Sequence, residues 1–244
     1  MGIILLLLLL GILLTLPSVQ TYIGGIVTKE LRESTGADIN VEKVAISVFG
    51  GVKLRGVLIK DHHQDTLIYA KSIQTKILNA KRLIDVDLIF GDLKADELTF
   101  YLTTYKGEEN SNINIFVEHF ENDNPKSDKP FILTSTNLKI TNGRFKVENQ
   151  NRENPVSVDF KKVNTDLDNF SINRDLITAD SEYFSFLYND GVFIENLKGK
   201  LKYSINQIHI LDLDALTKEG SVLGGKIILN YNEGDLSEFT DRVV

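Results

Sequence analysis

Histidines are the residues of this 244-residue chain whose type and spacing could bind a metal. His62 and His63 stand side by side in a segment rich in Asp and Gln, while His119 and His209 lie far away in the sequence. Adjacent residues of a strand point to opposite faces, and no carboxylate or Cys at ligand spacing accompanies the pair. The pattern favours a solvated turn over a metal site, so no metal is expected.

Paired carboxylates are the second candidate. Asp85 and Asp87 alternate with apolar residues, as do Asp212 and Asp214, so each pair is predicted to lie on one face of a strand. The water-facing side of a half-buried strand has the same pattern. Neither pair has a partner base or nucleophile, and no G-x-S-x-G, phosphate-cradling glycine loop or H-E-x-x-H motif occurs. We therefore expect no enzyme, no catalytic residue and no cofactor.

Composition excludes further classes of function. The chain has 27 basic and 34 acidic residues, without a Lys/Arg cluster that could follow a phosphate backbone, so nucleic acid is not an expected partner. It has no Cys, which excludes disulfides and thiolate metal sites.

The N-terminus carries the strongest targeting signal. Residues 2–16 are almost entirely Leu, Ile and Gly, and the first charged residue is Lys29. A helix over residues 2–27 would measure about 39 Å, enough to cross the hydrocarbon core of a bilayer. Residues 1–27 are therefore interpreted as a signal anchor or transmembrane helix. A cleaved signal peptide and a buried core helix are the alternatives, although the run has no basic start and no good cleavage site.

The rest of the chain is predicted to be mostly β-structure. From Ile39 onward, apolar residues recur with a period of two, which is typical of strands. Residues 28–37 are predicted to end the first helix and link it to a β-domain at 38–244. Helical spacing predicts a helix from Val19 to Ser34 and a short one at Ile113–Phe120. The polar end after Tyr231 indicates truncation of the natural chain at its C-terminus, and the missing basic flank indicates a start upstream of Met1.

Glycine and asparagine mark the expected turns between these strands. They occur at Phe49-Gly50-Gly51, Asn142-Gly143, Asn189-Asp190-Gly191 and Gly224-Gly225, where Gly and Asn accept positive φ at low cost. Short antiparallel hairpins follow from this spacing. Weak similarity between two hairpin segments, 137–147 and 195–203, favours an elongated architecture.

One face of the predicted strands is strongly apolar. If the sheet curls without closing, this face lines a trough that could hold hydrocarbon chains; the alternative is a plain core under a second layer. The residues predicted to line the trough share the apolar face of their strands and are Val44, Ile46, Val48, Leu98, Phe100, Leu102, Phe145, Val147, Val158 and Phe160.

Several segments resemble the N-terminal region of the TamB and AsmA-like (bridge-like lipid transfer) proteins, in a Bacteroidetes-type version. They are the apolar run, the stretch from Leu16 to Tyr22, the helix end from Glu30 to Gly36, and the strand patterns at 39–46, 56–59 and 212–231. These motifs are loose alternating patterns without a catalytic signature.

The resemblance implies an all-β fold with an N-terminal transmembrane helix and an elongated, curved, antiparallel sheet that forms an open β-groove, with one or two short helices. It implies a single-pass protein of the bacterial inner membrane, with the bulk of the chain in the periplasm, that moves phospholipid to the outer membrane. The alternative is an adaptor in outer-membrane protein assembly that binds partners through exposed strand edges. The expected partners are phospholipid, the inner membrane and an outer-membrane assembly protein.

Overall fold

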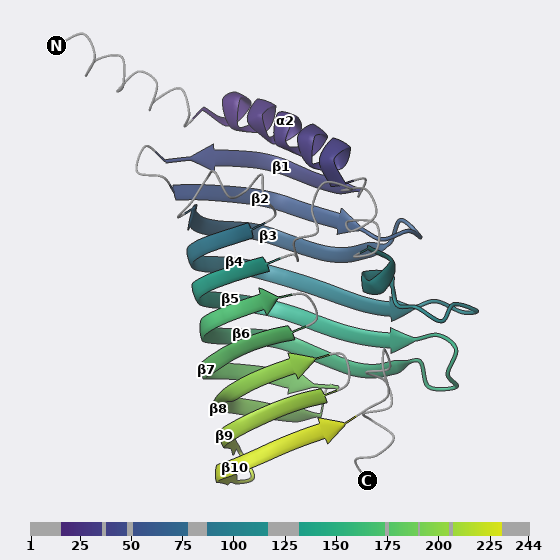
Figure 1. Cartoon of the computed structure of the whole chain (residues 1–244), viewed down its shortest axis with the longest axis vertical. Helices are drawn as coiled ribbons and strands as arrows, with labels where there is room; N and C mark the ends of the chain where they lie inside the picture. Colours follow the sequence, from purple (N-terminus) through teal and green to yellow (C-terminus); the bar gives the residue numbers. More distant parts are fainter. Residues whose placement is uncertain are drawn as a thin grey trace, which may run out of the picture.

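The chain folds into one open β-sheet with a long helix at its N-terminal end (Figure 1). The computed structural model describes residues 16–35, 38–47, 51–77, 87–116, 132–173, 176–189, 191–204 and 207–230. Helix α2 spans Pro17–Thr35, and a shorter helix spans residues 112–116. The ten strands are β1 (Ile39–Ile46), β2 (Gly51–Lys60), β3 (Thr66–Ile77), β4 (Asp87–Thr104), β5 (Ile132–Asn149), β6 (Val156–Asn173), β7 (Leu176–Tyr188), β8 (Val192–Ser204), β9 (Gln207–Thr217) and β10 (Ser221–Asn230).

The strands lie in the sheet in the order of the chain, from β1 at one edge to β10 at the other. This confirms the prediction of an open, all-β fold with one or two short helices. The prediction of a purely antiparallel sheet is wrong at one place, because β4 and β5 pair in parallel. A tight turn can join only antiparallel strands, whereas residues 105–131 between β4 and β5 form a connection long enough for a crossover. Every other neighbouring pair is antiparallel.

A band of irregular backbone crosses the sheet and bends its strands. Six strands each carry a residue with φ between 48° and 65° within this band: Gly56, Glu97, Asn142, Lys162, Asp212 and Gly224. These residues lie near one another in the register of the neighbouring strands β4, β5 and β6, and again in that of β9 and β10. The strand pairing shifts register beside four of them, at Asn142, Lys162, Asp212 and Gly224. An extra residue of this kind bends a strand and increases its twist. In Figure 1 the strands accordingly curve at the left, and their fainter halves pass behind the nearer ones.

Two of the predicted turns belong to this band. Asn142-Gly143 lies inside β5 and Gly224-Gly225 inside β10, so the prediction of a hairpin at each is wrong. A tight hairpin and a bulge both need positive φ, and the residue types alone do not separate them. Asn189, by contrast, does stand in the turn between β7 and β8, with φ of 44°.

Side chains satisfy backbone groups that the bend leaves without a ladder partner. Asn164 Oδ1 accepts a hydrogen bond from the Asn142 amide at 3.0 Å, and Asp214 Oδ1 accepts one from the Gly224 amide at 2.9 Å. The Thr165 hydroxyl donates to the Tyr183 carbonyl at 3.0 Å. The first two bonds are exposed to water, whereas the third is partly buried, and leaving a buried backbone group unpaired costs about 1–3 kcal/mol. The Thr165 hydroxyl therefore contributes most to stabilising the bend.

Helix α2 packs against the first strands. Ile23 and Val27 contact the cluster of buried side chains formed by Val41, Val44, Val57 and Ala70. Gly24 permits the close approach, because a Cβ there would lie 2.9 Å from the carbonyl oxygens of Val41 and Glu42. The Thr28 hydroxyl accepts a hydrogen bond from the Val41 amide at 2.8 Å, and Arg32 Nε donates to the Ile39 carbonyl at 2.8 Å. The helix thus covers the edge of β1, which protects it from pairing with other chains.

The predicted helix Val19–Ser34 is confirmed, since it lies within α2. Most of the apolar run of the predicted anchor, residues 1–15, lies outside the described residues. Among the helices that the structure describes, none combines the length and the apolar content needed to cross a membrane.

Candidate functional site: the apolar face of the bent sheet

A row of aromatic side chains crosses four strands on one face of the sheet. Phe100 of β4 stacks on Phe145 of β5, with ring centroids 5.6 Å apart, and Phe145 lies 6.1 Å from Phe160 of β6. Phe160 contacts Phe186 of β7 at 4.4 Å and Tyr188 at 5.7 Å. These residues meet because the strand register places Phe100, Phe145, Phe160 and Tyr188 opposite one another. Such aromatic pairs contribute about 0.5–1.5 kcal/mol each beyond area burial.

A second, aliphatic row lies beside the aromatic one. Leu102, Val147 and Val158 occupy successive strands in register, two residues along from the aromatic positions and therefore on the same face. Val147 and Val158 are buried. On the other side of the bend, the same sheet forms a further apolar cluster, in which Leu93, Ile140, Phe170 and Leu201 pack around Leu138, Leu167 and Ala179.

The predicted trough residues are therefore only partly brought together. Phe100, Leu102, Phe145, Val147, Val158 and Phe160 form the two rows just described. Val44 and Leu98 belong to the cluster against which α2 packs, so they are core residues near the helix. Ile46 lies at the end of β1 and is 43% exposed, while Val48 lies outside the described residues.

Sequence reasoning missed the continuation of the aromatic row on β7. Phe184, Phe186 and Tyr188 alternate with period two, which is the signal that identified the other strands, and Phe184 lies 5.2 Å from Phe186. The cluster around Leu138 was also missed. Even-numbered residues of β5, such as Leu138 and Ile140, face inward before the bend, and odd-numbered ones, such as Phe145 and Val147, face inward after it.

Charged pairs occupy the opposite face of the same strands. Arg144 Nε and Nη2 donate to the two carboxylate oxygens of Asp159 at 2.9 and 2.8 Å. Burial alone would raise the pKa of Asp159. The hydrogen bonds from Arg144 and the charges of Arg144 and Lys161 lower it by more, so the pKa lies below its usual value. The pKa of Asp166 is also lowered, chiefly by its hydrogen bond from Lys139. The sheet thus has one apolar and one charged face.

No second sheet lies over the apolar face in the part of the chain that the structure describes, where all ten strands belong to one sheet. Helix α2 has β1 as its main neighbour, at the edge of the sheet and three strands away from Phe100. Phe100, Phe145 and Phe160 accordingly remain half-buried although they stand in the middle of a ten-stranded sheet. An apolar face in this state can accept an apolar ligand.

The structure describes the surroundings of one of the two carboxylate pairs, Asp212 and Asp214. Asp212 pairs with Lys200 at 2.9 Å, and both side chains are largely exposed, while Asp214 accepts the Gly224 amide. Asp87 begins β4, and Asp85 lies outside the described residues.

The histidine pair differs in part from the sequence-based expectation. His62 and His63 lie in the turn between β2 and β3, and both rings meet the carboxylate of Glu108. The predicted solvated turn is confirmed, since both histidines are exposed turn residues. The expectation that no carboxylate accompanies them is wrong, because Glu108 lies 45 residues further along the chain and only the fold brings it near. These three residues could hold a metal ion.

The sites of the chain are thus an apolar face, built by the register of β4–β7, and a polar cluster at the end of β2 and β4. Comparison with known proteins adds no assignment to either. The sequence matches no protein-family model and none of the curated proteins with which it was compared.

Proposed function

We propose that the protein binds the acyl chains of phospholipids along the apolar face of its bent sheet, as a membrane-anchored β-groove that moves phospholipid towards the outer membrane. The supporting observation is the aromatic row Phe100–Phe145–Phe160–Phe186, in which the first three rings are half-buried and Phe186 is buried. No second sheet lies over this row among the described strands. Lipid headgroups would remain in water at the rim of the sheet. Transfer of this kind needs neither a cofactor nor covalent chemistry.

The dimensions of the sheet suit an acyl chain. Strands lie about 4.8 Å apart, so the row from β4 to β7 spans about 14 Å, close to the thickness of one leaflet of a hydrocarbon core of about 30 Å. All ten strands together span about 43 Å. Each CH₂ group that leaves water contributes about 0.8 kcal/mol, so ten such groups contribute about 8 kcal/mol. One partly buried acyl chain is therefore enough for stable binding.

Photo-crosslinking in living cells tests the proposal without detergent, which would compete for an apolar site. A benzophenone amino acid replaces Phe145 on the apolar face or Lys146, the next residue of β5, on the opposite face. We expect phospholipid adducts at position 145 and few at 146, detected by mass spectrometry of the purified chain. Equal adducts at both positions, or none at 145, would refute lipid binding on this face.

A charge placed in the row provides a second test. Phe145→Glu should prevent lipid crosslinking from a benzophenone at position 160, because a carboxylate on this face must keep its water. Lys146→Glu is the matched control, since it adds the same group to the charged face of the same strand.

An adaptor that binds partners by strand addition is the second candidate function. Its supporting observation is β10, which pairs only with β9 among the described strands and carries Leu223 at 78% exposure. An unpaired strand edge can accept a strand of another protein. Protein adducts from a benzophenone at position 223, together with no lipid adduct at position 145, would favour the adaptor.

A further inference from the structure

We propose that His62, His63 and Glu108 bind one Zn²⁺ ion, which braces the turn between β2 and β3 against the segment that follows β4. The three residues come from two segments 45 residues apart, and only the fold brings them together. This inference does not depend on lipid binding.

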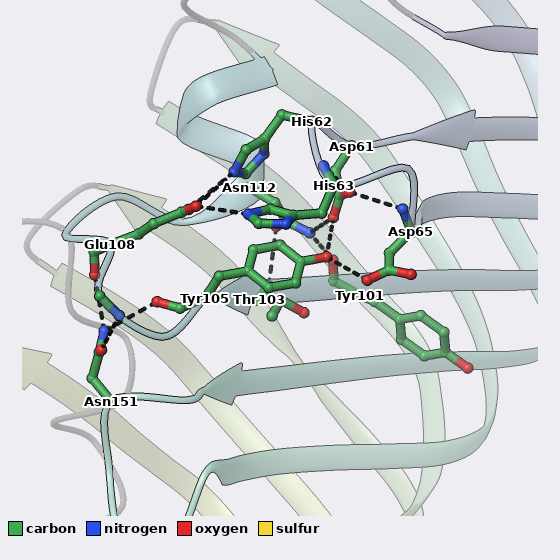
Figure 2. Close-up of polar contacts among 11 residues, drawn as sticks. Asp61, His62, His63, Asp65, Tyr101, Thr103, Tyr105, Glu108, Asn112 and Asn151 are labelled. Carbon is green, nitrogen blue, oxygen red and sulfur yellow. Dashed lines mark hydrogen bonds and ion pairs between the residues drawn. The ribbon is translucent and has the colours of Figure 1, made fainter.

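The ligand atoms already converge. Nε2 of His62 lies 3.0 Å from Oε2 of Glu108, and Nε2 of His63 lies 2.7 Å from Oε1. All three ligand groups lie within 4.8 Å of one another. Tetrahedral zinc bonded at about 2.0–2.1 Å holds its ligand atoms about 3.3 Å apart, so small shifts of these side chains would admit the ion. Figure 2 shows both imidazoles directed at the Glu108 carboxylate.

A buried hydrogen-bond network fixes the turn that carries the histidines. Asp61 is 4% exposed, and its Oδ1 accepts hydrogen bonds from the amides of His63 and Asp65 at 3.0 Å each. Its Oδ2 accepts from the Tyr105 hydroxyl at 2.7 Å and from Asn112 Nδ2 at 2.9 Å. These bonds hold the backbone of the turn in place, so both histidines extend towards Glu108 from a fixed segment.

The segment that carries Glu108 is held by further contacts of its own. Asn151 Nδ2 donates to the Glu108 carbonyl at 2.8 Å, and Asn151 Oδ1 accepts from the Gly107 amide at 2.7 Å. The Tyr105 ring lies against the His63 ring, with centroids 3.9 Å apart, and so limits its rotation. Both halves of the site are therefore positioned before an ion arrives (Figure 2).

The ligand types select the ion. Two imidazole nitrogens and one carboxylate suit Zn²⁺, whereas Mg²⁺ and Ca²⁺ prefer oxygen ligands. All three side chains are partly exposed, so an ion and a water ligand can reach the site.

Calorimetric titration of the tag-free, 244-residue chain in mild detergent tests the site after metal is removed with a chelator. We expect one Zn²⁺ per chain and no comparable binding of Mg²⁺. His63→Ala and Glu108→Gln should each weaken binding at least about a hundredfold, because losing even an outer partner costs about 10–100-fold. Glu109→Gln, which removes the neighbouring exposed carboxylate outside the cluster, should bind like the wild type.

Two measurements on the wild type keep the test independent of how the variants fold. X-ray absorption of the bound zinc should show two imidazole ligands, and zinc at a hundred times its dissociation constant should raise the unfolding midpoint by about 5–10 °C. The proposal would be overturned if no zinc bound, or if the absorption spectrum of bound zinc showed no imidazole ligand. It would also be overturned if folded His63→Ala and Glu108→Gln each bound zinc as tightly as the wild type.

Discussion

Asp159→Asn removes one charge from the ion pair between Asp159 and Arg144, and it should destabilise the sheet by about 2 kcal/mol. Breaking a fully buried pair costs about 3–5 kcal/mol, because the remaining charge is left without a partner. Here the Asp159 side chain is 11% exposed, but Arg144 is 38% exposed and can be hydrated. Asparagine also retains one oxygen to accept from Arg144. The expected loss therefore lies below the range for buried pairs.

Urea unfolding at pH 7 measures the effect. With a slope of about 2 kcal/mol per molar urea, the midpoint should fall by about 1 M. Asp212→Asn is the matched control, because it makes the same chemical change in an exposed ion pair. The Asp212 side chain is 72% exposed and that of its partner Lys200 is 67% exposed. Asp212 has φ of 54°, which asparagine tolerates well. Its midpoint should move by less than about 0.3 M.

The pH dependence identifies the cause. The pKa of Asp159 in the folded protein is lowered, so its ionised form stabilises the fold above the unfolded pKa of about 3.9, and this stabilisation is lost as pH falls through the folded pKa. The difference between wild type and Asp159→Asn should be constant from pH 7 to 5 and shrink below about pH 4. A difference that persists unchanged below the folded pKa, or an equal loss in Asp212→Asn, would refute the assignment to this ion pair.

Two further substitutions test the bend. Gly56→Ala should lower stability by about 1–2 kcal/mol in thermal unfolding, because Gly56 has φ of 58° and a Cβ there would lie 2.3 Å from the Glu42 side chain. Gly220→Ala in open space should have little effect, and equal results would show that neither the left-handed backbone nor this close contact matters. Thr165→Val should cost about 1–2 kcal/mol by leaving the Tyr183 carbonyl without its hydrogen bond, and Thr141→Val at an exposed position of β5 should be nearly neutral in the same urea assay. A stable Thr165→Val protein would mean that the Tyr183 carbonyl finds another donor.

The alternation of apolar residues was enough to predict most of the strands. Phe145 and Val147 lie on one face of β5 and Val158 and Phe160 on one face of β6, as the period of two requires. The long bent strands were not predicted, because the alternation restarts at each bend: Val41 and Val44 belong to one buried cluster although they are three residues apart. This restart was visible in the sequence and could have identified the bends.

The sequence was enough to assign each trough residue to a face of its strand. It did not show which residues of the neighbouring strands lie beside it. Phe100 meets Phe145 only because β4 and β5 are parallel, and this depends on the path of residues 105–131. The histidines meet Glu108 because β2, β3 and β4 pair antiparallel, which places the ends of β2 and β4 at the same edge of the sheet. Contacts between residues 45 positions apart leave no periodic signal in a single sequence.

The sequence by itself determined the local conformations. It predicted strands where apolar residues alternate, and a helix over residues 19–34, which lies within α2. It also placed positive φ at Asn142 and Gly224, since short or absent side chains tolerate that backbone. Only the tertiary structure decided whether such a residue turns the chain or bends a strand, because hydrogen bonding to the neighbouring strand separates the two outcomes. The open, apolar face and the His62–His63–Glu108 cluster depend on the same long-range pairing.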